Sequence, residues 1–260
     1  MDKLKVLKDI YATRQECIGI NATPINDLSR PLECWESKFG GLPYLSKEFP
    51  YPKNNKGEPL HLLAQINFMD MPRLDHFPLD GILQFYIDAD DVYGMDLDGE
   101  NSSGFKVIYI PYYTEDNFHY DKDYSNKSDL SFLKTPEYFP IDCEHKISFF
   151  RTFKPISCSN PDFSSCFAEY INQDELEPDF YELYSSLIND SNIHQIGGYP
   201  SFTQEGPSYL KERKDLILLL QIGHDQKISF GDAGIATFFI ERKDLINLNF
   251  SNVLYYWDCY

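Results

Sequence analysis

Apolar residues in this chain gather in short runs that end near Pro, Gly or Asp. Leu62–Ile66, Ile82–Ile87 and Leu216–Leu220 are such runs, and each has the length of a buried strand. The 20 phenylalanines and 19 tyrosines also favour strands, because flat rings pack well on a pleated face. The pattern predicts an α+β, β-rich fold with mixed or antiparallel sheets and a few peripheral helices.

Two segments instead repeat their apolar residues at helical spacing. Residues 1–17 predict an amphipathic N-terminal helix. Its apolar face would hold Leu4, Leu7, Ile10 and Tyr11. Residues 177–188 predict a second helix, because Pro178 suits a first turn and an apolar stripe follows it. That stripe consists of Phe180, Leu183, Tyr184, Leu187 and Ile188.

The most informative pattern is a similarity between the two halves of the chain. Four blocks recur in the same order and at similar spacing. They pair Phe39–Pro43 with Ile196–Pro200, Leu62–Ile66 with Leu218–Ile222, Gly81–Ile87 with Gly234–Ile240, and Val107–Tyr109 with Val253–Tyr255. Gln65 follows Gly41 by 24 residues, and Gln221 follows Gly198 by 23. This order predicts that one folding unit occurs twice.

We therefore expect one domain over residues 1–260, with repeat copies at approximately 39–113 and 196–259. Duplication predicts two related sheets packed about a pseudo-twofold axis. The segment at approximately 114–195 is too rich in aromatic residues to be a linker, so we expect it to fold onto the rest. Each Gly-Gly pair predicts a turn with positive φ, and Gly81 and Gly234 predict close backbone approaches.

On these blocks the sequence resembles the YwqG-like family, a bacterial domain of unknown function. The resemblance covers most of the chain, although Phe230 replaces the usual tryptophan before Gly-Asp-Ala-Gly. Its motifs are Gly40–Pro43, Leu63–Asn67, Gly81–Gly94, Gly197–Gln204, Gly231–Gly234 and Tyr256–Cys259. The resemblance implies a duplicated, sheet-rich α+β fold and no established catalytic residue. Relatives are associated with bacterial toxin–immunity gene neighbourhoods, which implies a protein-binding role.

The net charge of −18 at pH 7 would repel a phosphate backbone, so we expect no nucleic-acid partner. The charged start of the chain lacks the apolar core of an export signal. No apolar stretch approaches the roughly 18 residues of a spanning helix. These features predict a cytoplasmic protein without a membrane partner. They also predict that the six cysteines are reduced and mostly packed.

Candidate metal and catalytic residues are few. Acidic residues between 88 and 100 could supply oxygen ligands to calcium, but their spacing does not fit an EF-hand. The weak metal candidates are Asp88, Asp90, Asp96 and Asp98. The other interpretation is a solvated loop with turn-forming aspartates. The six histidines show no zinc pattern, and Cys34 and Cys259 could be nucleophiles but lack a recognisable base. We expect no cofactor and assign no catalytic residue.

Repetition singles out a set of polar residues at matching or nearly matching positions. If the copies meet at the pseudo-twofold axis, these side chains could line one ligand groove. They are Gln65, Gln84, Gln221 and Asp232. The other interpretation is that each amide bonds loop backbone, since buried polar groups must be paired.

The sequence favours a non-enzymatic protein-binding module of an immunity-like or regulatory kind. Its partner would be another protein, toxin-like or regulatory. The alternative is a small-molecule-binding protein or a hydrolase with a pocket between the two repeats.

Overall fold

The computed structural model describes residues 2–25, 32–45, 48–95, 104–113, 136, 138–172, 175–188 and 194–260. Ten strands form one large sheet, and every strand pairing in it is antiparallel. The strands are β1 (Gln15–Pro24), β2 (Lys38–Phe39), β3 (His61–Asn67), β4 (Ile82–Ile87), β5 (Phe105–Ile110), β6 (His145–Lys154), β9 (Gln195–Gly197), β10 (Leu216–Ile222), β11 (Ile235–Glu241) and β12 (Leu254–Asp258). The predicted β-rich fold is confirmed, but the expectation of two separate sheets is wrong.

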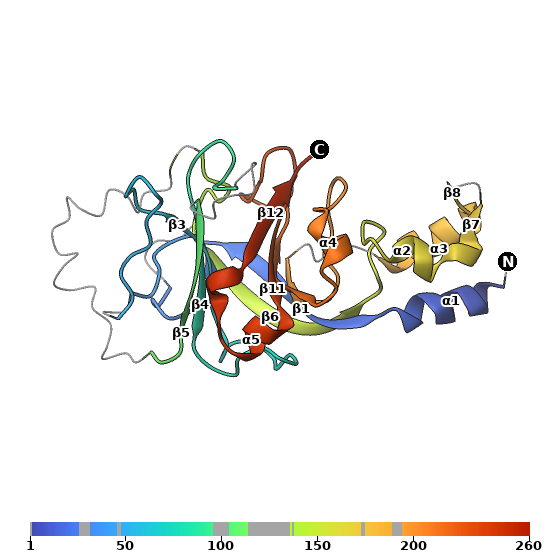
Figure 1. Ribbon diagram of the computed structural model, residues 1–260, viewed down its shortest axis with the longest axis horizontal. Coiled ribbons are helices and arrows are strands. Elements are labelled where there is room, and N and C mark those ends of the chain that lie inside the picture. Colours follow the sequence, from blue (N-terminus) through green and yellow to red (C-terminus); the bar gives the residue numbers. More distant parts are fainter. Residues whose placement is uncertain are drawn as a thin grey trace.

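The order of strands across the sheet is β12-β11-β10-β9-β1-β6-β2-β3-β4-β5. The two central strands, β1 and β6, pair along their whole length from Gln15 opposite Lys154 to Pro24 opposite His145. Both lie outside the segments 39–113 and 196–259 that resemble each other. The long central pairing therefore joins the two sets of outer strands into one sheet (Figure 1).

The sheet curves until it is nearly closed on itself, so that its two ends face each other. The rings of Phe85 on β4 and Phe238 on β11 lie 4.9 Å apart between centroids. Near the two edges, the ring of Phe105 on β5 lies 5.3 Å from that of Tyr255 on β12. The main hydrophobic core lies on this concave side and takes residues from both ends of the sheet.

Short helices and a small second sheet accompany the large one, and several of them gather at one end of the molecule. The α-helices are α1 (Lys3–Ala12), α2 (Phe163–Cys166), α3 (Pro178–Leu187), α4 (Tyr209–Glu212) and α5 (Arg242–Ile246). The 3₁₀ helices are η3 (Ala168–Tyr170) and η4 (Phe250–Asn252), and the small sheet pairs β7 (Ile171–Asn172) with β8 (Glu175–Leu176). Figure 1 shows α1, α2 and α3 together at one end of the molecule, away from the outer strands of the large sheet. None of the helices in the described ranges combines the length and apolar character that crossing a bilayer requires.

Both predicted helices are present, with one correction to the first. Helix α3 begins at Pro178 and buries Phe180 and Tyr184, as its apolar stripe predicts. Helix α1 ends at Ala12, and its buried residues are Val6 and Ile10. The predicted face is wrong at Leu4 and Tyr11, whose exposed fractions are 61% and 48%. The reason is that α1 packs on α3 and α2 around a small separate core, which needs only a narrow stripe.

Two predicted glycine roles are confirmed. The residues of both Gly-Gly pairs have φ between 64° and 71°, the left-handed region that favours glycine. At Gly234 a Cβ atom would lie 2.2 Å from the carbonyl oxygen of Asp258 and 2.3 Å from that of Phe230. At Gly81 a Cβ atom would lie 2.8 Å from the carbonyl oxygen of Ile110. The backbone approaches so closely at these strand starts that a side chain does not fit.

Candidate functional site

Gln65 lies in β3 and is fully buried, with an exposed fraction of 0%. Its Nε2 donates hydrogen bonds to the carbonyl oxygens of Cys34 at 2.7 Å and Glu36 at 2.9 Å. Its Oε1 accepts a hydrogen bond from the N–H of Tyr44 at 2.7 Å. One amide thus ties the segment before β2 to the segment after the first Gly-Gly turn.

Gln84 lies directly opposite Gln65 on the neighbouring strand β4. Its Nε2 donates to the carbonyl oxygen of Tyr44 at 2.7 Å and to Oε1 of Gln65 at 2.9 Å. The hydroxyl of Tyr86 donates to its Oε1 at 3.0 Å. The two amides and the loop backbone form one buried, fully bonded network, as buried polar groups require.

Gln221 on β10 holds the second Gly-Gly turn in the same manner. Its Oε1 accepts from the N–H of Ser201 at 2.8 Å. Ser201 follows the second Gly-Gly-x-Pro motif, as Tyr44 follows the first. Opposite Gln221 on β9 lies Gln195, whose Nε2 donates to the carbonyl oxygens of Gly197 at 3.0 Å and Tyr199 at 2.9 Å. Sequence reasoning did not single out Gln195.

Asp232 is exposed in the loop between β10 and β11, and its carbonyl oxygen accepts from the N–H of Tyr260 at 3.1 Å. The structure therefore brings Gln65 and Gln84 together, places Gln221 under the other turn, and leaves Asp232 at the surface. The glutamine amides bond chiefly to backbone groups of loops. A ligand groove shared by the four residues stays a prediction of the sequence.

Two aspartates of the acidic loop hold backbone or side-chain groups by hydrogen bonds, one to a distant segment and one within its own turn. Oδ2 of Asp88 accepts from Nδ2 of Asn54 at 2.8 Å. Oδ1 of Asp90 accepts from the N–H groups of Val92 at 3.2 Å and Gly94 at 2.8 Å. Asp96 and Asp98 lie outside the described residues. Within the described ranges, no three His, Cys, Asp or Glu side chains gather as metal ligands.

The candidate nucleophile Cys34 is a poor one, because burial raises the pKa of its thiol to about 12. A thiol with that pKa is uncharged at neutral pH. Cys259 is partly exposed. All six cysteines are free, but the expectation of mostly packed thiols holds only in part, since Cys158 and Cys166 are exposed.

His194 is a buried histidine whose contacts fix its protonation. Its Nδ1 accepts a hydrogen bond from the N–H of Gly223 at 3.2 Å, so this nitrogen carries no hydrogen. Its Nε2 lies 3.4 Å from Oδ2 of Asp225 and can donate to it. Burial lowers the pKa of His194 to about 4, although Asp225 partly offsets the effect. The folded protein thus holds this ring neutral.

Acidification is therefore expected to destabilise the protein through His194. Between pH 6.5 and about 4 the unfolded chain binds a proton at His194 that the folded chain excludes. The part of the free energy of unfolding that depends on His194 is greatest well above pH 6.5, where neither state binds this proton. It falls by about 2 kcal/mol between pH 7 and pH 5. Urea unfolding at both pH values should show that H194Q, which keeps an acceptor but does not titrate, loses about 2 kcal/mol less than the wild type. Equal losses in both proteins would contradict the assignment.

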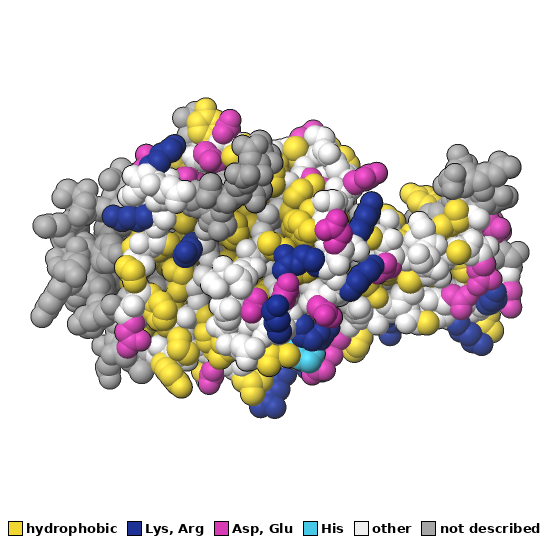
Figure 2. Space-filling view, viewed as in Figure 1, with side chains coloured by type: hydrophobic (Ala, Val, Ile, Leu, Met, Phe, Trp, Pro, Cys, Tyr) yellow, Lys and Arg dark blue, Asp and Glu magenta, His cyan; other side chains and the backbone are white. Residues whose placement is uncertain are grey.

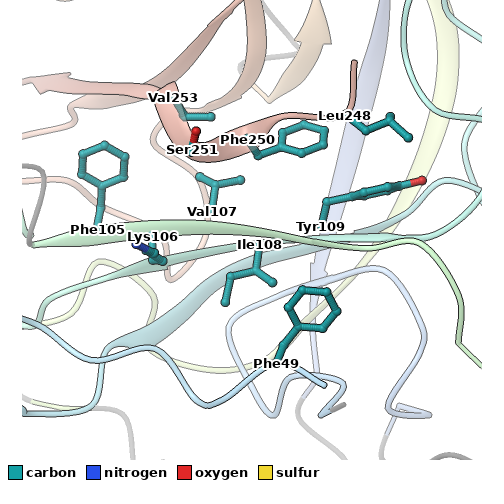
Figure 3. A pocket seen from close by; sticks show the side chains of 10 residues that line it. All are labelled: Phe49, Phe105, Lys106, Val107, Ile108, Tyr109, Leu248, Phe250, Ser251 and Val253. Carbon is teal, nitrogen blue, oxygen red and sulfur yellow. The ribbon is translucent and has the colours of Figure 1, made fainter. Parts of the chain in front are cut away.

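A cavity of about 290 Å³ lies at the seam where the two ends of the curved sheet approach each other. It is lined by Phe49, Phe105, Lys106, Val107, Ile108, Tyr109, Leu248, Phe250, Ser251 and Val253. In Figure 3, Val107 and Tyr109 point from β5 toward Phe250 of η4, whereas Ile108 points to the other side, toward Phe49. The rings of Tyr109 and Phe250 lie 5.3 Å apart between centroids. Burial raises the pKa of Tyr109, which keeps its hydroxyl protonated.

Sequence reasoning missed this seam. Its walls come from β5 and from the segment around η4, which lie far apart in the chain and meet only through the curvature of the sheet. The alternation of Phe105, Val107 and Tyr109 with Lys106 and Ile108 was the available signal. It marks a strand with two different faces but does not indicate that one edge is open.

The fold and the seam define a β-rich protein built on one nearly closed antiparallel sheet with a groove of mixed polar and apolar lining near its edges. The chain matches the family model described as Domain of unknown function (DUF1963) over residues 37–259, and it belongs to this family. The match includes the Gly-Gly turns, the buried glutamines and the seam. A search of curated proteins found no match.

Proposed function

We propose that this protein is a non-enzymatic protein-binding module, immunity-like or regulatory. The observation that carries the proposal is a group of exposed apolar side chains at one end of the sheet. Met69, Leu79 and Tyr112 have exposed fractions of 70%, 57% and 84%. Large apolar side chains that gather at a surface are typical of interaction sites.

Met69 follows β3, Leu79 precedes β4 and Tyr112 follows β5, at the same end of these three neighbouring strands. Asn67 of β3, Ile82 of β4 and Ile110 of β5 lie opposite one another in register. The loops beyond them are linked, since the hydroxyl of Tyr109 donates to the carbonyl oxygen of Asp80 at 3.0 Å and that of Tyr113 lies 3.6 Å from Sδ of Met69. Figure 2 shows hydrophobic side chains over the part of the molecule where β4 and β5 lie. The arrangement supports a docking surface for a polypeptide.

The charge of the chain indicates the kind of partner. A net charge of −18 attracts cationic proteins and accelerates their encounter. Basic side chains on the face in Figure 2 are mixed with acidic ones around α4 and α5. There Arg213 pairs with Glu241, and Lys214 pairs with Asp162 at 2.7 Å, so these cations are partly neutralised. The excess of negative charge therefore favours a positively charged partner protein, toxin-like or regulatory.

The alternative is a small-molecule-binding protein or a hydrolase with a pocket between the repeats. The seam cavity favours a ligand site between the segments 39–113 and 196–259, because both contribute to its walls. However, its lining contains neither a carboxylate nor a histidine. Carboxylates and histidines are the commonest general acids and bases of hydrolases, and the lining offers Lys106, Tyr109 and Ser251 in their place, so the cavity supports ligand binding more directly than hydrolysis.

We also propose that the chain arose by internal duplication, with copies at approximately 39–113 and 196–259. Register supports it: the β3–β4 pairing shifts between Leu62 and Ala64, and the β10–β11 pairing shifts between Leu218 and Leu220. Each shift lies at the same distance before the buried glutamine of its strand. The fourth block needs a correction, since Val107 lies opposite Phe85 but Tyr255, not Val253, lies opposite Phe238.

The finer assignment to the YwqG-like family, a bacterial origin and a cytoplasmic location belong to the same proposal. The Gly-Gly turns support the family assignment, whereas Phe230 departs from the family's usual motif. Phe230 stands where that family usually has tryptophan, and it packs against Tyr93 and Trp257 at centroid distances of 5.4 and 6.4 Å. Phe230 thus lies among aromatic side chains in this protein.

The test is purification of the tagged protein from its source cells, followed by native and denaturing mass spectrometry. We expect a stoichiometric polypeptide to co-purify with the wild type and to be lost from the double variant L79D/Y112D. The matched control Y181D changes an aromatic residue on α3 with a similar exposed fraction to that of Leu79, and it should retain the polypeptide. A stoichiometric small molecule instead of a polypeptide would support the alternative function.

A further inference from the structure

Within the described ranges, strand β5 has one edge on which no strand pairs. In the part of the chain that the structure describes, β5 pairs with β4 on one side and with no strand on the other. The facing edge strand β12 does not close the gap by hydrogen bonds, because η4 and side chains lie between them. An open edge presents N–H and C=O groups that can pair with another strand.

One hydrogen bond shows which backbone groups of β5 point toward β4 and which point away from it. The N–H of Asp88 donates to the carbonyl oxygen of Gly104 at 2.7 Å, so these opposite residues form a hydrogen-bonded pair. Hydrogen-bonded pairs alternate along an antiparallel ladder, so Lys106, Ile108 and Ile110 also point their backbone groups to β4. The backbone groups that point away from β4 belong to Phe105, Val107 and Tyr109. Among the described residues they have no backbone partner.

The seam cavity runs along these three residues. Figure 3 shows β5 between two walls, with the segment Leu248–Val253 on one side and Phe49 on the other. An added strand would place alternate side chains against Val107, Tyr109 and Phe250 in one wall, and the intervening ones near Ile108 and Phe49. The groove thus offers backbone pairing together with two apolar contacts for alternate side chains.

The net charge of the chain favours a positively charged segment as the occupant of the groove. A second copy of this chain carries the same charge of −18, so pairing of two β5 edges is opposed by long-range repulsion. A segment of a cationic protein is attracted instead. Lys106 lines the groove, so basic residues are expected to flank the paired segment rather than lie opposite that side chain.

We propose that β5 receives an extended segment of a positively charged partner protein, which adds as a further strand and fills the seam groove. The segment would carry apolar residues at the positions that face the two walls and basic residues before and after the paired stretch. This inference rests on the proposed protein-binding function and adds the β5 edge to the docking surface that Met69, Leu79 and Tyr112 form. Recognition by strand addition draws its affinity from backbone hydrogen bonds and its specificity from pockets for alternate side chains.

The probe is a phage-displayed library of random twelve-residue peptides, selected on the wild-type protein. We expect enriched peptides with alternating apolar residues and net positive charge. Binding of a synthesised enriched peptide should slow hydrogen exchange at the amides of Phe105, Val107 and Tyr109 at least about tenfold. The amides of Lys106 and Ile108 are already bonded to β4 and should change little.

A groove-filling variant provides the second measurement. S251W places a large side chain in the lining without altering β5 and should weaken peptide binding at least about tenfold. The matched control S165W changes an exposed serine on α2 and should leave affinity unchanged. Unchanged melting temperatures of both variants show that the fold is intact. If S251W does not fold, the exchange pattern of the wild type decides alone.

Three results would overturn the inference: no enriched peptide, equal binding to both variants, or binding without slowed exchange at the three amides. A wild-type dimer that S251W dissociates would also overturn it in favour of self-pairing. The proposed function is tested separately. If a polypeptide co-purifies equally with S251W and the wild type, the protein-binding function stands and the β5 groove is not its docking surface.

Discussion

Replacing Gln65 with leucine is expected to lower the free energy of unfolding by about 3–5 kcal/mol. Leucine fills a similar volume but leaves the carbonyl oxygens of Cys34 and Glu36 and the N–H of Tyr44 without the amide that bonds them. A buried donor or acceptor that loses its partner costs roughly 1–3 kcal/mol. Urea unfolding of Q65L at pH 7 measures the loss.

The matched control is Q226L, which changes an exposed glutamine and should stay within about 0.5 kcal/mol of the wild type. Q221L should lie between the two, at about 1–3 kcal/mol, because it deprives the N–H of Ser201 of its acceptor. If Q65L unfolds within about 0.5 kcal/mol of the wild type, the amide does not clamp the loop and a binding role for Gln65 becomes the better interpretation.

Replacing Gly234 with alanine is expected to cost about 3 kcal/mol or more. The new Cβ would lie 2.2 Å and 2.3 Å from two backbone carbonyl oxygens, so strands β11 and β12 must move apart. No rotation of a side chain can relieve a clash between backbone atoms and Cβ. Thermal unfolding of G234A should show a melting temperature lowered by several degrees.

G57A is the control that separates this clash from ordinary glycine effects. Gly57 has a φ of +81°, but an added Cβ there meets no atom within 4 Å. Its cost should be that of an alanine in the left-handed region, roughly 1–2 kcal/mol. Similar losses in G234A and G57A would show that the approach of β11 to β12 is looser than the structure has it.

Local patterns predicted local structure well. Pro178 and the apolar stripe after it located α3, and the Gly-Gly pairs located turns with positive φ. The apolar run before Gln221 located β10. In each case the deciding interactions lie within a few residues of the pattern. The face of α1 was mispredicted at Leu4, because the position of α3 decides which residues α1 buries.

The sheet as a whole could not be predicted from such patterns. β1 and β6 lie outside the repeated blocks, so the similarity drew attention away from the central strands. The glutamine network was predicted only as one of two interpretations, because the partners of Gln65 lie in loop segments 21 and 31 residues away along the chain. The seam groove depends on curvature, which no spacing along the chain records.

The position of the two central strands ties the ends of the sheet together topologically. β1 precedes β2 to β5 in the chain, but in the sheet it pairs with β9 of the other set. β6 precedes β9 to β12 in the chain, but in the sheet it pairs with β2. A cut of the chain between β5 and β6 would leave β1 in the first fragment and β6 in the second. Each of these strands pairs with an outer strand that belongs to the other fragment. The two halves are therefore interlocked like a fused, strand-exchanged dimer. Neither half can complete its share of the sheet until the other has been synthesised.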